Sequence, residues 1–246
     1  MTLEVCVSSV EDALAARDGG AQRIELCSAL EVGGITPSVG LMKEVRAIPQ
    51  LDMHVLIRPR GGDFLYDESE IRCMEEDIRQ AIACGVDGVV IGALTADGYI
   101  DINTCQRLIK TAQGMNVTFN RAFDLCTNPL QALEEIIALG CNRLLTSGQA
   151  SKAVLGIPLL KELVHIANGR ITIMPGCGVN AQNARQILLE TCANEIHASA
   201  SHVIDSVIKF RHTNVNMGNP GQDEYTRKVT NGNEVQAIIQ AINSIV

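Results

Sequence analysis

Short runs of apolar residues recur along the chain, and most are followed by a segment whose apolar positions repeat at helical spacing. Eight runs have the length and alternation of β-strands. These strands are expected at Leu3–Val7, Arg23–Leu26, Met53–Ile57, Gly88–Ile91, Val117–Asn120, Arg143–Thr146, Ile171–Met174 and Glu195–Ala198. Helices are expected at Val10–Arg17, Ser38–Ala47, Glu68–Cys84, Asp101–Gln113, Pro129–Leu139, Pro158–Ala167, Ala181–Glu190 with Asn180 as its N-cap, and Glu234–Ile245.

Strand and helix alternate eight times, which predicts an α/β fold: one (β/α)8 TIM-type barrel that forms a single domain over residues 1–246. A doubly wound open sheet ranks lower, because no GxGxxG opens the first strand-to-helix turn. The pattern loses its period after the eighth strand, over 199–232, where Asn219-Pro220-Gly221 signals a loop. We expect a long irregular segment there, acting as a lid or a packing arm.

The composition of the chain limits which partners and which cellular setting are expected. The chain of 246 residues carries a net charge of −8, which argues against nucleic acid or an acidic membrane surface as a partner. It has no apolar run long enough to span a bilayer and starts without a signal peptide, so we expect a cytoplasmic protein. Its nine cysteines lack CxxC or zinc-finger spacing, which favours reduced thiols over a disulfide framework or structural zinc. The oligomeric state stays open, a homo-oligomer included.

Alternate residues of a barrel strand face the interior, and here many of those residues are polar. The charged ones are expected to pair among themselves, since buried charges need partners. The pairs could be only structural, or they could line a polar cavity at the carboxyl ends of the strands. The expected inward residues are Glu4, Cys6, Arg23, Glu25, Cys27, His54, Arg58, Thr118, Asn120, Glu195, His197 and Ser199, with pairing among Arg23, Arg58, Glu4, Glu25 and Glu195.

Three strand ends carry residues suited to a small anion. Arg58 and Arg60 flank Pro59 before Gly61-Gly62, Arg121 and Asp124 follow the fifth strand, and Gly176 and Gly178 follow the seventh. Arginine binds carboxylates and phosphates through charge-assisted bonds, and glycine loops expose backbone N–H groups. Surface turns are the simpler interpretation. The enzyme hypothesis takes Arg58, Arg60, Arg121, Gly176 and Gly178 as anion-binding residues and Glu25, Arg58, Asp124 and His197 as catalytic candidates.

Two cysteines stand out from the others. Cys6 and Cys27 end the parallel triplets Glu4-Val5-Cys6 and Glu25-Leu26-Cys27, so on neighbouring strands their sulfurs could flank one metal ion. Adjacent strands are roughly 4.8 Å apart, and soft thiolates favour Cu(I). The alternative is a pair of packed thiols, as expected for the cysteines in helical segments.

Several motifs in order resemble the copper homeostasis protein CutC family: Glu4-Val5-Cys6, Arg23–Cys27, Gly33–Ser38, Arg58–Phe64, Arg121–Asp124, Leu145–Gly148 and Glu195–His197. The resemblance implies a TIM-type barrel, a cytoplasmic setting and a role in copper homeostasis. It also implies Cu(I) as ligand, because the Cys6 and Cys27 positions match cysteines proposed to bind Cu(I) in the animal members. One departure is Asn120, where the family usually has histidine. Copper binding is therefore the first hypothesis, and an enzyme acting on a small phosphate or carboxylate substrate at the C-terminal face is the alternative.

Overall fold

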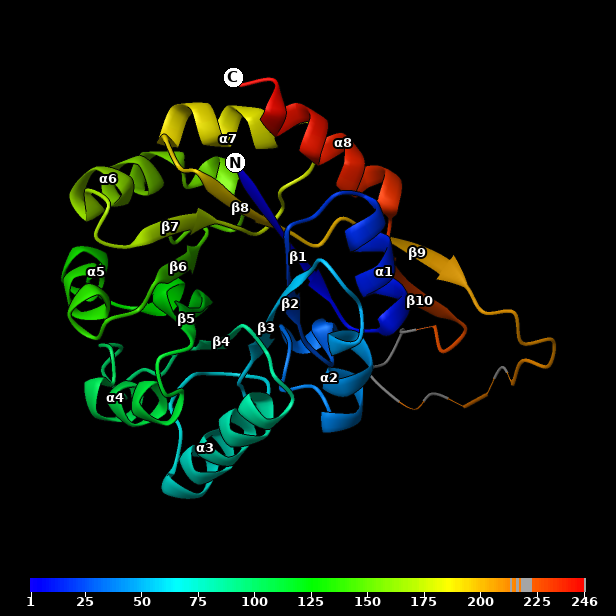
Figure 1. Cartoon of the computed structure of the whole chain (residues 1–246), viewed down its shortest axis with the longest axis horizontal. Helices are drawn as coiled ribbons and strands as arrows, with labels where there is room; N and C mark the ends of the chain where they lie inside the picture. The colour runs from blue at the N-terminus through cyan, green and yellow to red at the C-terminus, as the bar shows by residue number, and fades with distance from the viewer. Residues whose placement is uncertain (213, 216, 218–222, 246) are drawn as a thin grey trace.

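The computed structural model describes residues 1–212, 214, 215, 217 and 223–245. Eight parallel strands run in the order β7-β6-β5-β4-β3-β2-β1-β8, and β7 and β8 lie side by side to close the ring (Figure 1). The predicted TIM-type barrel is thus confirmed. The strands are β1 (Thr2–Val7), β2 (Arg23–Leu26), β3 (Asp52–Leu56), β4 (Gly88–Ile91), β5 (Asn116–Phe119), β6 (Arg143–Thr146), β7 (Thr172–Pro175) and β8 (Glu195–Ala198).

Helices surround this ring, and most begin at a polar cap that the sequence supplies. Asp67 and Glu70, for example, form a reciprocal capping box at the start of α3. The helices are α1 (Val10–Asp18), α2 (Val39–Arg46), α3 (Glu68–Ala83), α4 (Ile102–Thr111), α5 (Pro129–Ala138), α6 (Ile157–Ala167), α7 (Ala184–Thr191) and α8 (Gly232–Asn243), with short 3-10 turns η1 (Leu30–Val32), η2 (Arg121–Leu125) and η3 (Ala153–Leu155).

The start of α7 differs from the prediction. Asn180 does not cap the helix, because its side-chain oxygen accepts from the backbone N–H groups of Gln182 and Asn183 and so closes a turn. The helix itself begins at Ala184. The prediction of Asn180 as the N-cap was therefore wrong, and the helix starts about one turn later than expected.

The segment after β8 is more ordered than expected. It contains β9 (Ser201–Asp205) and β10 (Thr226–Thr230), which pair antiparallel and project from the side of the barrel (Figure 1). Nearly every residue of β9 is exposed. A strand without a buried face leaves no apolar alternation in the sequence, which explains why this one was missed. The predicted loop at Asn219-Pro220-Gly221 lies outside the described residues.

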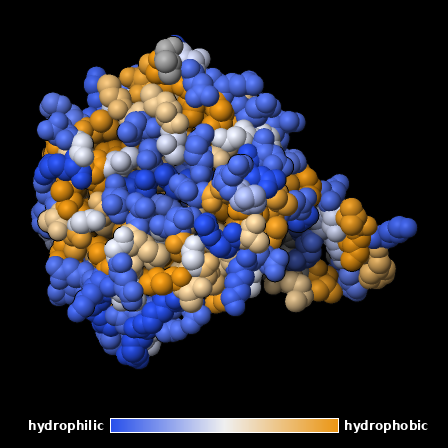
Figure 2. Space-filling model, in the orientation of Figure 1, coloured by the Kyte–Doolittle hydropathy of each residue, from blue (hydrophilic) through white to orange (hydrophobic). Residues whose placement is uncertain are grey.

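The main apolar core lies between the strands and the helices. Leu3, Val5 and Val7 of β1 are fully buried there, as their alternation predicts. The interior of the ring holds the opposite set of side chains, and Figure 2 shows polar residues gathered at the centre of the face viewed down the barrel. Within the described part of the chain, none of the helices combines the length and the apolar character that crossing a bilayer requires.

Candidate functional site

The register of the first two strands decides which polar side chains meet inside the barrel. Glu4 lies opposite Arg23, and Cys6 lies opposite Glu25. From the sequence, the triplets Glu4-Val5-Cys6 and Glu25-Leu26-Cys27 were expected to align residue for residue. The structure does not align them, and Cys27 lies two positions beyond the residue opposite Cys6. Both cysteines still face inward, because two positions along a strand restore the same side of the sheet.

An ion-pair network fills the middle of the barrel. Arg23 binds Glu4, with Nε–Oε2 at 2.5 Å, and also contacts Glu195. Arg143 binds Glu195 from the other side, again with Nε–Oε2 at 2.5 Å. The predicted pairing of Arg23, Glu4 and Glu195 is confirmed. Arg143 was missed, although its place at the start of the sixth strand gives it the inward parity.

Glu4 also holds His197. The Glu4 Oε1 and His197 Nδ1 atoms are 2.8 Å apart, and the other ring nitrogen, Nε2, lies 3.9 Å from Glu25 Oε2. Burial disfavours the imidazolium ion, yet the contacts with Cys6 and Glu4 raise the pKa of His197 well above its usual value. Burial likewise opposes ionisation of Glu4, but the bond from His197 and the charge of Arg23 hold the pKa of Glu4 well below its usual range.

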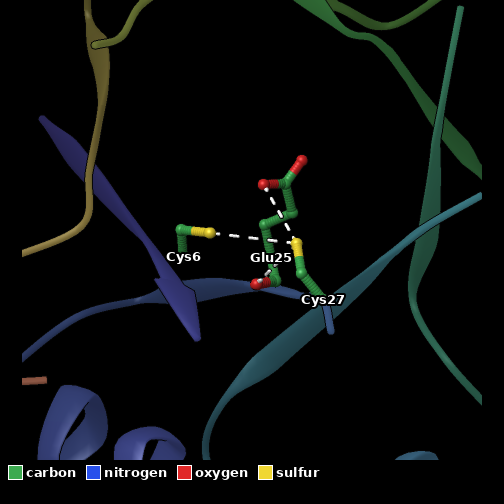
Figure 3. Close-up of side chains that lie close together, drawn as sticks. All are labelled: Cys6, Glu25 and Cys27. Carbon is green, nitrogen blue, oxygen red and sulfur yellow. Dashed lines mark hydrogen bonds between the residues drawn. The ribbon is translucent and has the colours of Figure 1, made fainter. Parts of the chain in front are cut away.

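The two predicted metal ligands lie at the edge of this network. The Cys6 and Cys27 sulfurs are 3.8 Å apart, and the Cys27 thiol is 3.5 Å from Glu25 Oε2 (Figure 3). Ligand atoms of these three residues lie within 4.8 Å of one another. Cys6 is partly exposed, whereas Cys27 and Glu25 are buried. The structure thus brings Cys6, Cys27 and Glu25 into one group, with His197 beside it.

The thiols differ in their acidity. The hydrogen bond with Cys27 lowers the pKa of Cys6 to about 6 against the effect of burial, with a further contribution from His197. The same hydrogen bond, together with burial, raises the pKa of Cys27 well above its usual value. Burial and the charge of Cys6 raise the pKa of Glu25 to about 8. One thiolate next to one thiol is the state these contacts favour near neutral pH.

Arg58 does not pair with a glutamate, contrary to the prediction. Its guanidinium donates to the backbone carbonyls of Val32, Gly34 and Gly62 and lies over the ring of Phe64, 4.7 Å from the centroid. The reason is position: Arg58 lies past the end of β3, where loop carbonyls are closer than the carboxylates of the interior. The buried Nε of Arg58 has no partner within the described residues.

Two other arginines of the anion hypothesis already have side-chain partners. Arg60 binds Glu70 and Asp63. Arg121 binds Asp124 and donates to the Ser147 hydroxyl.

Asp124 and Asn120 organise the loops that follow β5 and β6. Asp124 accepts from the hydroxyls of Thr146 and Ser147 and from two backbone N–H groups, so it fixes the loop after β6. Asn120 accepts from the N–H of Ala122 and caps η2.

The glycines after β7 are required by close packing and backbone angle. A Cβ on Gly176 would lie 2.5 Å from Leu145 Cδ1, and Gly178 has φ of +70°. The loop does not open a helix directly, since α7 begins only at Ala184. The side chain of Lys152 packs against Gly178 and was missed by sequence reasoning, because it belongs to the loop after β6 rather than to a strand end.

Comparison with known proteins agrees with these motifs. The CutC family model matches residues 1–202. The family protein CutC of Bacteroides thetaiotaomicron is 52% identical over 98% of this chain and 98% of its own. The human copper homeostasis protein cutC homolog is 48% identical, over 96% of this chain and 87% of its own. A crystal structure of the copper homeostasis protein CutC from Streptococcus agalactiae superposes with a TM-score of 0.78 at 35% identity, covering 81% of this chain and 98% of that one. This chain belongs to the CutC family.

Proposed function

We propose that this protein takes part in copper homeostasis by binding Cu(I) through Cys6 and Cys27, in the cytoplasm. The observation that carries the proposal is the 3.8 Å separation of the two sulfurs, which lets both reach one ion. All nine cysteines are free thiols in this structure.

The chemistry of the group suits Cu(I). Thiolate is a soft ligand that favours Cu(I) over hard cations, and the lowered pKa of Cys6, about 6, makes one thiolate available at neutral pH. Glu25 lies close enough to act as a third donor or to hold the Cys27 thiol in place. His197, fixed by Glu4, supports Cys6 from the barrel interior.

Competition with a chromogenic Cu(I) chelator tests this proposal. The reduced parent protein is expected to hold about one Cu(I), and Cys6→Ser/Cys27→Ser to lose most of that affinity. Cys84→Ser/Cys192→Ser is the matched control, because both of those cysteines lie at the carboxyl ends of helices, outside the barrel interior. Unchanged affinity in the Cys6/Cys27 variant would show that these thiols only pack.

We further propose, as a second candidate, an enzyme acting on a small phosphate or carboxylate at the C-terminal face. The packing of Lys152 against Gly178 favours this enzyme candidate, since the lysine adds a cation to the glycine loop after β7. Arg121 is half-exposed after β5, two strands from β7. Phosphate is expected to raise the melting temperature of the parent more than chloride at equal ionic strength, and Lys152→Ala to abolish the difference. Equal effects of both anions on the parent would contradict this candidate.

A further inference from the structure

Cys6 and Cys27 differ in their access to solvent while their sulfurs lie 3.8 Å apart. Cys6 is partly exposed at the end of β1, whereas Cys27 is 1% exposed and lies behind it. An accessible thiol next to a buried one is the arrangement in which the first attacks an external disulfide and the second resolves the adduct. We propose that Cys6 and Cys27 are a redox-active pair that undergoes reversible thiol–disulfide exchange with small-molecule disulfides, independently of copper.

The two sulfurs are near enough for a bond to form after a local shift. A disulfide is about 2.05 Å long, so the sulfurs must approach each other by a little under 2 Å. Cys27 lies just beyond the last residue of β2, and its N–H still donates to Val7 of β1 at 2.9 Å. Closing the bond therefore requires a small backbone shift at this strand end, just past the last residue of β2.

The bond formed there is expected to be easily reduced. Cys27 is a diagonal neighbour of Cys6, since Glu25 is the residue directly opposite. Diagonal neighbours on adjacent strands have Cα atoms about 7–8 Å apart, beyond the usual range of about 4.4–6.8 Å for disulfides, so the closed bond would be strained and would require a backbone shift. Strained disulfides are the labile ones that small thiols reopen.

The exchange balances with a small-molecule disulfide as the oxidant. The Cys6 thiolate attacks one sulfur of that disulfide, whose S–S bond breaks, and the first small thiolate leaves and takes up the proton that Cys6 lost. The Cys27 sulfur then attacks Cys6, the mixed disulfide breaks, and the second small thiolate leaves. Cys27 gives up its proton as it attacks, and that proton goes to the departing thiolate. Two electrons pass from the two cysteines to the small molecule, which becomes two thiols.

Oxidised glutathione and copper-free, fully reduced protein provide the test. After acid quenching and alkylation, peptide mass spectrometry is expected to find a Cys6–Cys27 disulfide that reduced glutathione reopens. In Cys27→Ser, a glutathione adduct should persist on Cys6, because no resolving thiol is present. In Cys6→Ser, Cys27 should stay unmodified, because it is buried.

Cys73 and Cys192 are exposed and serve as internal controls for the oxidant in the same sample. The proposal is overturned if these two are modified while Cys6 and Cys27 remain free thiols, or if the parent keeps a glutathione adduct on Cys6 as Cys27→Ser does. The parent protein alone distinguishes these outcomes, so a variant that fails to fold does not affect them. Because no copper is present, a negative result here leaves the copper proposal standing on its own test.

Discussion

Glu4 and His197 lie directly opposite each other on β1 and β8, and the Oε1–Nδ1 distance between them is 2.8 Å. On its other side Glu4 lies opposite Arg23, which it binds at 2.5 Å. One fully buried carboxylate therefore joins the ion-pair network of the barrel to the histidine next to Cys6. This makes Glu4 the residue that links the ion-pair network to the proposed copper site.

Glu4→Gln should therefore be strongly destabilising. The substitution keeps the shape of the side chain but leaves Arg23 and His197 short of a buried negative charge. Breaking a buried pair by removing one partner costs about 3–5 kcal/mol. The free energy of unfolding in urea measures this cost. Glu11→Gln is the control, because the ion pair of Glu11 with Arg227 is exposed and such pairs contribute about 0–1 kcal/mol. Equal losses in the two variants would contradict the role assigned to Glu4.

Glu25→Gln should weaken Cu(I) binding without abolishing it. The thiols remain, but the carboxylate that contacts Cys27 at 3.5 Å is lost. Residues that support metal ligands typically contribute roughly 10–100-fold in affinity, and a loss of that size is expected in chelator competition. Glu31→Gln, an exposed glutamate on the following η1 turn, should leave the affinity unchanged. An unchanged affinity in Glu25→Gln would restrict the site to the two cysteines.

His54 should make the stability of the protein depend on pH. Burial lowers the pKa of His54 to about 4, below the value of 6.5 for a free histidine. The unfolded chain therefore binds a proton as pH falls through 6.5, while the folded protein takes it up only near pH 4. Stability attributable to His54 is present above pH 6.5 and is lost between there and pH 4, by up to about 3 kcal/mol.

Comparison of parent and His54→Gln isolates this effect, since other titrating groups are common to both. The neighbouring groups that act on the His54 charge are Glu4, Arg23, Arg143 and Asp87. The parent should lose more stability than the variant between pH 6.5 and 4 in urea unfolding. Parallel stability curves would show that His54 titrates normally in the folded state.

How far the sequence could predict the barrel depends on burial. Strands such as β1, with Leu3, Val5 and Val7 all buried, carry a strong period and were located to within one or two residues. The exposed β9 carries no such period and was missed. The alternation of strand residues likewise predicted correctly that Glu4 and Arg23 face the barrel interior.

The candidate site was predicted only in part, because register and loop contacts are not encoded in a local pattern. Cys6 and Cys27 were brought together on the assumption of aligned triplets, whereas the structure offsets them and still places their sulfurs 3.8 Å apart. The partners of Arg58 are three loop carbonyls that no periodicity could reveal. Lys152 reaches Gly178 only through the folding of two separate loops.

Arg58→Ala should destabilise the protein far more than Arg60→Ala, although the two arginines are two residues apart. Arg58 is 4% exposed and joins the loop after β2 to the loop after β3 through the carbonyls of Val32, Gly34 and Gly62. Its removal leaves the buried carbonyl of Gly34 unpaired, at about 1–3 kcal/mol, and loses the bonds to the more exposed carbonyls of Val32 and Gly62. Arg60 is half-exposed, and its partners Glu70 and Asp63 can turn to water instead. Thermal unfolding of the two variants measures the difference, and similar melting temperatures would mean that Arg58 does not hold the two loops together.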